Sequence, residues 1–264
     1  YEAPLTEQVE RLRAVTVEEV REIHQQLLSA AVGELTVLGD FDPDAALKAI
    51  EKLTADWKSD VSFTRIPRVH VNNVKGSTEK ITTPDKANAA FIAMMTLPLR
   101  DDHPDYAGLA IGNFILGSGG LNSRLGDRVR QKDGLSYTIQ SGLQPSAVDE
   151  RTAFFIFAIS NPENADKVNT AIQEELQRLL VDGITREELE AAKTGYLQEQ
   201  QVSRSNDAAL APMLEAYAFI GRDMKHVAQF EEQIRALTVD QVNEALRRHL
   251  KPERLFVIMA GDFK

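Results

Sequence analysis

The residues best suited to chemistry in this sequence are an arginine and a tyrosine seven positions apart, Arg130 and Tyr137. A guanidinium offers five hydrogen-bond donors in a fixed fork, and a phenol adds one more. Together they could hold the carbonyl oxygens of an extended peptide, or the oxyanion of a peptide under attack. The alternative is that Tyr137 shares a strand face with Leu135 and Ile139 in the core, while Arg130 is a solvated helix end. Spacing alone favours this alternative.

The stretch from residue 117 to residue 137 must position this pair, and it predicts a glycine turn, a short helix, a glycine stop and a strand. The turn glycines allow a tight bend or a close approach to another segment. Asn122 or Ser123 can cap the helix, and Gly134 suits the left-handed residue after its end. The glycines of the turn are Gly117, Gly119 and Gly120. The predicted buried stripe of the helix is Leu121, Leu125 and Val129.

Composition narrows the classes of partner. The chain has 264 residues, 43% hydrophobic and 27% charged, which is ordinary for a globular protein. A net charge of −10 makes nucleic acid and anionic membrane surfaces poor partners. No cysteine is present, so disulfides, thiolate catalysis and cysteine-ligated zinc are excluded. No apolar run reaches the ~18 residues of a membrane span. Because the chain begins at Tyr1 and not at Met, we expect a fragment or a processed product.

The order of elements predicts an α+β fold with a mixed, largely antiparallel sheet covered by helices on one face. Capping boxes at Thr16 and Thr185 and the Asp42-Pro43 pair mark helix starts. The predicted strands are 34–38, 69–74, 77–81 and 89–97 (77–81 and 89–97 as a hairpin), then a strand from 135, 152–160 and 255–259. The predicted helices cover 6–30, 43–57, a stretch from Pro104 to the glycine turn, 162–181, one from Thr185, 208–221, 223–237 and 238–250.

An internal repeat predicts the domain organisation. Residues 13–42 align without gaps on residues 235–264, an offset of 235 − 13 = 222, and both copies carry Gly-Asp-Phe immediately before their last residue. Two chance helix–strand units would not share so many positions. We therefore expect residues 1–64 to be the tail of a preceding unit, and residues 65–264 to be most of the next one.

The histidines give no local metal motif. No two of the five lie closer than 23 residues, so no helical pair can bind zinc at i and i+4. No P-loop or nucleophile-elbow motif occurs either. The Glu174-Glu175 and Glu187-Glu188 pairs are expected to be solvated on helix faces. We predict no metal site in this chain. The five histidines are His24, His70, His103, His226 and His249.

Several blocks resemble one family of peptidases. The blocks are Asp102–Leu109, Ile115–Leu125, Val129–Tyr137 and Gly183–Lys193, with the two Gly-Asp-Phe tails. In this order they resemble the C-terminal, non-catalytic half of M16 (pitrilysin/insulinase-type) zinc metallopeptidases, and the match covers most of residues 65–264. The resemblance implies a LuxS/M16 metallopeptidase-like fold, in which two halves close around a chamber.

The resemblance also implies a role for the pair. In that family the zinc and the general-base Glu lie on an inverted His-x-x-Glu-His helix of the catalytic half, and the other half supplies an Arg and a Tyr that hold the peptide. Arg130 and Tyr137 match that spacing, which reverses the preference stated above. His-x-x-Glu-His is absent here, so this chain alone should bind no catalytic zinc and cleave nothing.

The expected function is therefore the substrate-binding half of a zinc metalloendopeptidase, with zinc in a catalytic partner half that is tethered or separate. Its partners would be that half and a peptide. The turn glycines either border the chamber or only end a helix. The alternative is a structural or assembly subunit of M16-like fold, of the respiratory-complex core-protein type, with no proteolytic role. A third possibility is a stand-alone peptide-binding module. Exported relatives lead us to expect a periplasmic location.

Overall fold

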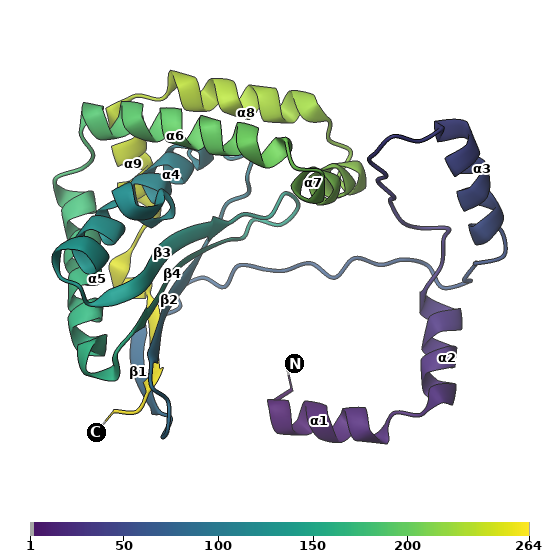
Figure 1. The fold of residues 1–264 in the computed structure, drawn as a ribbon, viewed down its shortest axis with the longest axis horizontal. Coiled ribbons are helices and arrows are strands. Elements are labelled where there is room, and N and C mark those ends of the chain that lie inside the picture. Colours follow the sequence, from purple (N-terminus) through teal and green to yellow (C-terminus); the bar gives the residue numbers. More distant parts are fainter. Residues whose placement is uncertain (1–2, 264) are drawn as a thin grey trace. The chain divides into compact units, whose positions relative to one another are not determined.

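The computed structural model describes residues 3–263 and divides the chain into two compact units. The larger unit joins Pro67–Asn206 to Arg222–Lys264, and the smaller joins Tyr1–Ile66 to Asp207–Gly221. Figure 1 shows the ribbon of both, with labels on most of the helices and strands. None of the helices in the described part of the chain has the length and apolar character that a membrane span needs. The candidate site lies in the larger unit, which is described first.

A five-stranded sheet is the frame of the larger unit. Its strands follow the order β1-β5-β2-β4-β3. β1 pairs with β5 in parallel, and every other pairing is antiparallel. β4 has the bounds predicted from its apolar run. A buried strand inside a sheet contains few polar residues, so the apolar run marks where the strand begins and ends. The strands are β1 Ser77–Thr82, β2 Ala89–Leu97, β3 Ser136–Gln144, β4 Thr152–Ser160 and β5 Phe256–Gly261.

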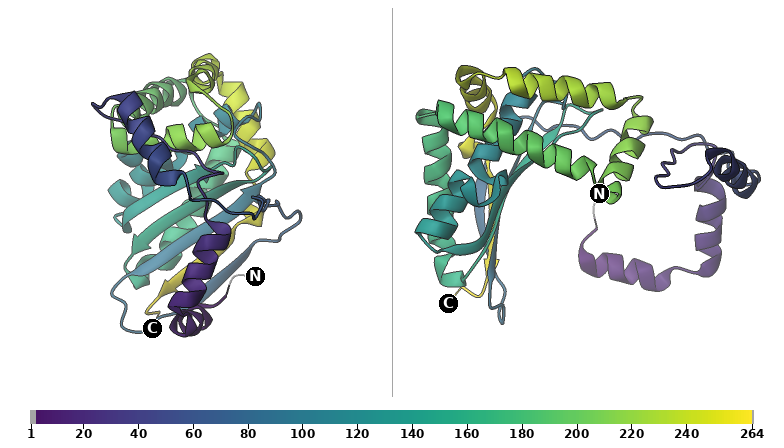
Figure 2. Two further views of the ribbon diagram at one scale, coloured as in Figure 1. Left: turned by 90° about the vertical axis from the view of Figure 1, so that its right-hand side faces the viewer. Right: turned by 45° about the horizontal axis from the view of Figure 1, so that its top comes forward.

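Helices cover one face of this sheet, as Figures 1 and 2 show. Alternate residues of β2 are buried beneath the helices, among them Phe91 and Ala93. The side chains between them, such as Ile92 and Met94, remain partly exposed on the other face. This arrangement confirms the predicted α+β fold with one covered face. The covering helices are α4 Tyr106–Asn113, α5 Ala165–Val181, α6 Arg186–Arg204, α8 Met224–Ala236 and α9 Val239–His249.

The smaller unit has little core of its own. None of its helices contains a buried residue. Its aromatic contacts are a stacked pair, His24 and Trp57, with ring centroids 5.7 Å apart, and an edge-on pair, Phe63 and Phe219, at 6.4 Å. The domain boundary at residues 64 and 65 stays a prediction. The helices are α1 Leu5–Ala14, α2 Val17–Leu27, α3 Pro43–Thr54 and α7 Asp207–Phe219.

Four sequence predictions need correction. Residues 6–30 form two helices and not one, because Val15 is extended and Thr16 caps a new helix. Residues 34–38 form no strand in the described structure, since no segment pairs with them. Residues 69–74 form none either, because a turn at Asn73, with φ of 60°, interrupts the run. β1 and β2 are not a hairpin, because β5 lies between them.

The two copies of the internal repeat therefore share a helix in the structure, but not a strand. Thr16 and Thr238, 222 positions apart, each form a complete capping box, with Glu19 and Gln241 respectively. After the second copy's helix the chain enters the sheet as β5, whose residues alternate towards the core. The equivalent segment of the first copy, residues 34–38, has the same kind of sequence and no partner strand. A strand needs a neighbour to satisfy its backbone, whereas a capped helix does not.

Candidate functional site

The stretch around the candidate pair begins with a change of helix type. After α4 the backbone continues as a π-helix, Phe114–Ser118, a feature frequent at functional sites. Gly120 then takes a φ of +69°, which only glycine adopts without strain. Ser123 caps the next helix, since its Oγ accepts the Gly126 N–H at 3.1 Å. The chain therefore leaves α4, turns and re-enters a short helix within about ten residues.

Gly117 has a packing role that the structure makes explicit. A Cβ at this position would lie 2.6 Å from both the N and the Oγ of Ser141 on β3. Ser141 is buried, and its Oγ donates to Asn113 Oδ1 at 2.7 Å, so it cannot move aside easily. The glycine permits the close approach of the π-helix to the strand. Whether Gly117, Gly119 and Gly120 also border a chamber stays a prediction.

We expect Gly117→Ala to lower the free energy of unfolding by roughly 1–3 kcal/mol, because overpacking forces backbone shifts. Urea denaturation followed by circular dichroism measures this. Gly33→Ala is the matched control, since a Cβ at Gly33 would meet nothing within 4 Å. Equal stability of the two variants would contradict a packing role for Gly117.

The short helix ends at a glycine and returns the chain to the sheet. The last part of the helix, Gly126–Lys132, is a π-helix. Gly134, which follows it, has the predicted left-handed conformation, with φ of +61°. The Leu135 N–H donates to Val129 O at 2.9 Å, which fixes the turn. Leu125 and Val129 are fully buried as predicted, but Leu121 is about half exposed. The stripe is therefore shorter than the sequence indicates.

The structure brings Arg130 and Tyr137 together. The Arg130 Cζ lies 4.4 Å from the centroid of the Tyr137 ring, within the range of a cation–π interaction. Tyr137 is 80% exposed, so its placement in the core, which spacing alone favours, is wrong. The cause is a shift of the β3–β4 register between Ser136 and Thr138. This irregularity breaks the alternation that would have turned the ring inward with Ile139.

The polar atoms of the pair are free of other partners in the part of the chain that the structure describes. Arg130 has no ion pair there, and neither its guanidinium nor the Tyr137 hydroxyl has a hydrogen bond. The neighbouring arginines differ. Arg128 pairs with Asp133 at 2.7 Å, and also with Glu174. Arg130 and Tyr137 therefore present a set of unused donors, held in place by the ring contact.

Arg124, from the same helix, is the residue whose role sequence reasoning missed. Its Nε and Nη2 bind both oxygens of Glu188 at 2.7 and 2.8 Å, and Nη2 also donates to the Gly183 carbonyl. Burial opposes the ionisation of Glu188, but hydrogen bonds from Arg124 and from the Thr185 N–H outweigh it and hold the pKa of this carboxyl below its ordinary value. The prediction that Glu188 is solvated is wrong, and so is the same prediction for Glu175, which is buried. The sequence places Glu188 three residues after a capping threonine, and this was the available signal for its role. Nothing in the sequence indicates its partner Arg124, 64 residues away.

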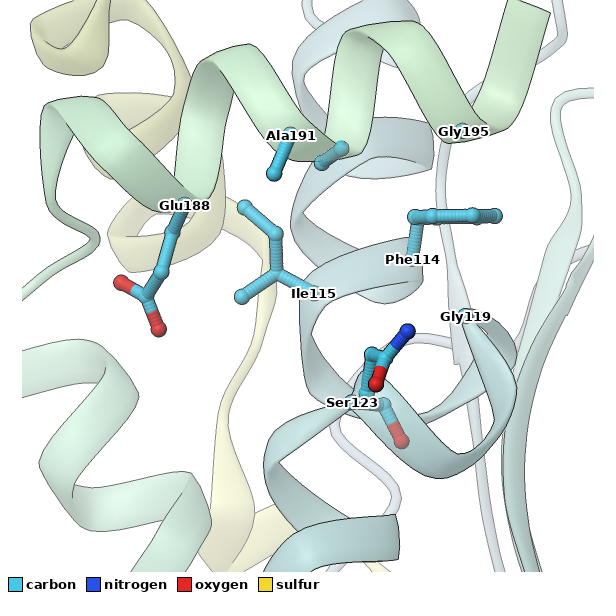
Figure 3. A pocket seen from close by; sticks show the side chains of 9 residues that line it. Phe114, Ile115, Gly119, Ser123, Glu188, Ala191 and Gly195 are labelled. Atoms are coloured by element: carbon cyan, nitrogen blue, oxygen red, sulfur yellow. The ribbon is translucent and has the colours of Figure 1, made fainter. Parts of the chain in front are cut away.

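A cavity of about 330 Å³ lies between the glycine turn and α6 (Figure 3). Phe114 and Ile115 from the turn side and Ala191 from α6 make its apolar walls. Glu188 lies at one end and Ser123 at the other. Because the Glu188 oxygens are already engaged by Arg124, the cavity offers few free polar groups to a ligand. Its only charged lining residue is therefore already paired, and among the described residues the cavity adds no free charged group to the candidate site.

Two histidines and a carboxylate meet elsewhere in the unit. Ligand atoms of His103, Asp105 and His249 lie within 4.8 Å of one another, the one such group among residues 3–263. The Asp105 carboxylate accepts from His249 at 2.8 Å and from Arg248 at 2.6 Å, and His103 Nδ1 accepts the Asp105 N–H. A guanidinium bound to the carboxylate repels a dication, so these residues do not fit the zinc site of a peptidase. The prediction of no metal site in this chain stays a prediction.

Comparison with known proteins gives a consistent family of relatives. The family model described as peptidase M16 inactive domain matches residues 14–196. The uncharacterized zinc protease YmxG of Bacillus subtilis is 24% identical over 215 residues, which cover 81% of this chain and 50% of that protein. The non-peptidase homolog YmxG of Helicobacter pylori is 21% identical over 187 residues, covering 70% and 43%. The chain thus spans about half the length of these curated relatives.

Solved structures agree. A peptidase M16 inactive domain from Pseudomonas fluorescens has a TM-score of 0.73 and 25% identity, covering 94% of this chain and 58% of that chain. A protease from Helicobacter pylori has a TM-score of 0.75 and 16% identity, covering 96% and 60%. Both likenesses confirm the fold that the sequence blocks indicate.

Proposed function

Because the chain belongs to the peptidase M16 inactive-domain family, we propose that it is the substrate-binding, non-catalytic half of an M16-type zinc metalloendopeptidase. It holds an extended peptide while a catalytic half located elsewhere hydrolyses it. Zinc belongs to that catalytic half, since the His-x-x-Glu-His motif is absent from this sequence. The Bacillus subtilis relative, named an uncharacterized zinc protease, supports this assignment at the level of the family.

One observation carries the proposal, the exposed Arg130–Tyr137 pair. The ring contact at 4.4 Å orders both side chains, so little entropy is lost when they bind. The guanidinium fork suits a peptide carbonyl, and the phenol hydroxyl donates to the same carbonyl or to the oxyanion that develops from it. An interaction that strengthens as charge develops on the oxygen raises the rate and not only the affinity.

The relatives are long enough to contain a catalytic half in addition to a unit like this chain. This chain covers 50% and 43% of the two YmxG proteins, so a second unit of similar size fits in the remaining length. The tail predicted at residues 1–64 would complete that preceding unit. Its exposed apolar residues, such as Leu12, Ile23 and Leu53, support this role, since a helix buries its apolar stripe against a neighbour. The periplasmic location stays a proposal too, to be tested by fractionation.

Reconstitution tests the proposal directly. Hydrolysis of a quenched fluorescent peptide with added zinc is measured with this chain alone, and then with the candidate catalytic half supplied as a tethered or separate polypeptide. We expect no hydrolysis by the chain alone, and hydrolysis by the pair that exceeds the rate of the catalytic half alone. Activity of this chain alone, or no gain over the catalytic half, would refute it.

A second function has one observation in its favour. A relative from Helicobacter pylori is named a non-peptidase homolog, which fits a structural or assembly subunit of M16-like fold. In that case Arg130 and Tyr137 would have no ligand. Peptide binding by this chain, measured by fluorescence anisotropy, separates the two functions, because the structural role predicts none.

A further inference from the structure

A second cavity, of about 350 Å³, combines apolar walls with two arginines that have no carboxylate partner among the described residues. Its floor is the uncovered face of the sheet, where β2 contributes Met94 and Thr96 and β5 contributes Phe256. Its roof is the segment of residues 67–76, here called the strap, which contributes Val69, Val71 and Val74. Pockets for small ligands begin at about 300 Å³, so this one suits the end of a chain and not a folded domain.

Hydrogen bonds hold the strap near both of its ends. At its start, the Arg68 N–H donates to Asp149 Oδ2 at 3.0 Å, and His70 Nδ1 is 2.8 Å from Thr96 Oγ1. At its end, the Gly76 N–H donates to Glu253 O at 3.2 Å. A Cβ at Gly76 would lie 2.5 Å from the Leu255 carbonyl oxygen, so this close approach requires glycine. The cavity is therefore built by specific contacts.

Two guanidiniums line the cavity, those of Arg151 and Arg254. In the described chain neither has a carboxylate partner, although most arginines of this unit have one. His70, between two valines of the strap, has a buried Nε2 without a hydrogen-bond partner among the described residues. Burial and then the charge of Arg254 hold the pKa of His70 below its ordinary value. Unpaired charge beside apolar walls on a chain of net charge −10 marks a place for an anion.

We propose that this cavity binds the C-terminal residue of a peptide, with the terminal carboxylate on Arg151 and Arg254 and an apolar side chain against the valines and Phe256. A terminal residue carries its carboxylate and its side chain on one carbon, so it meets the charged and the apolar parts of the wall together. An aspartate or glutamate side chain would satisfy the charges only. Guanidinium forks bind planar carboxylates through paired hydrogen bonds.

This inference rests on the proposed peptide-binding function and specifies which peptides the chain prefers. It assigns a second contact to the peptide, separate from Arg130, in the short helix before β3, and from Tyr137, on the edge strand β3. It would favour substrates that have a free apolar C-terminus.

The test compares one labelled Gly-Ser peptide ending in Ala-Leu as the free acid and as the amide, by fluorescence anisotropy with the full chain. We expect the free acid to bind at least ~10-fold more tightly, since a hydrogen bond to a charged group contributes on that order. Arg151→Gln and Arg254→Gln should each remove about 10-fold of the affinity for the acid and leave the amide unchanged. Arg235→Gln, on α8, is the matched control and should change neither.

A third variant tests the cavity itself. Val71→Phe fills it from the strap and should weaken binding of the acid without altering either arginine. Equal affinities for acid and amide would overturn the inference, as would a short fatty acid that binds more tightly than the peptide acid, which would make the ligand a lipid. Neither result would touch the proposed function, because a Tyr137 variant would still slow hydrolysis by the reconstituted enzyme.

Discussion

Tyr137→Phe is expected to lower peptide turnover by the reconstituted peptidase by about 10²–10³-fold, the usual effect of losing one donor to a developing oxyanion. The variant removes only the hydroxyl, which has no other partner among the described residues, and keeps the ring under Arg130. Arg130→Ala should lower turnover to a similar degree, because it removes the fork and also frees the ring. Steady-state hydrolysis of a quenched fluorescent peptide measures both.

Stability and a neighbouring residue give the controls. Tyr137 is 80% exposed, so neither variant should change the free energy of unfolding by more than the roughly ±0.5 kcal/mol typical of surface changes. Arg128→Ala changes the same helix, but Arg128 is engaged by Asp133 and Glu174, so turnover should stay at the wild-type level. Wild-type turnover in both Tyr137→Phe and Arg130→Ala would remove the roles assigned to the pair.

The pair also shows how far local sequence reasoning reaches. Spacing placed Arg130 at a helix end and Tyr137 early on a strand, and Gly134 predicted the turn between them correctly. The face of Tyr137 could not be predicted, because strict alternation turns it inward with Ile139. The register shift after Ser136 decides its exposure, and that shift depends on β4, which is distant in sequence. Only the resemblance to a family pointed to the exposed arrangement.

Elements whose stability is local were predicted well. The capping boxes at Thr16 and Thr185 form as expected, because each joins residues three positions apart. β4 was predicted with its bounds, because nearly every residue in it is apolar.

Elements that depend on partners distant in the sequence were not predicted correctly. Residues 34–38 and 256–261 have similar sequences, yet only residues 256–261 form a strand, β5, which pairs between β1 and β2. The Arg124–Glu188 ion pair could not be predicted for the same reason, because its two residues are far apart in the sequence. The cavity beneath residues 67–76 could not be predicted either, because its walls come from widely separated segments. Pairing across such distances is a property of the assembled sheet and its helices.

Arg124→Leu is the stability change we expect to be largest among the polar residues of the larger unit. The Arg124 and Glu188 side chains are only 17% and 29% exposed, so removing the guanidinium leaves a carboxylate and the Gly183 carbonyl largely out of water. Breaking a fully buried pair costs about 3–5 kcal/mol, and partial exposure reduces this to about 2–3 kcal/mol. Urea denaturation at pH 7 measures the loss.

A double variant separates the charge from the packing. Glu188→Gln keeps the cap on the Thr185 N–H but carries no charge, so Arg124→Leu with Glu188→Gln should lose about 1 kcal/mol less than Arg124→Leu alone. An equal or greater loss in the double variant would show that stranded charge is not the cause, and that Arg124 acts through its packing and its bond to Gly183.

The pH dependence gives an independent check on the same pair. The folded pKa of Glu188 is lowered, so the stability that its ionised form contributes is present above its ordinary value near 4.5 and is lost as pH falls through the folded pKa. In Arg124→Leu the unpaired carboxyl instead favours its neutral form, so acid relieves the defect. The difference in unfolding free energy between wild type and Arg124→Leu should therefore shrink as pH falls from 7 to below 4.5. A difference that stays constant with pH would mean that the guanidinium stabilises the fold without its charge.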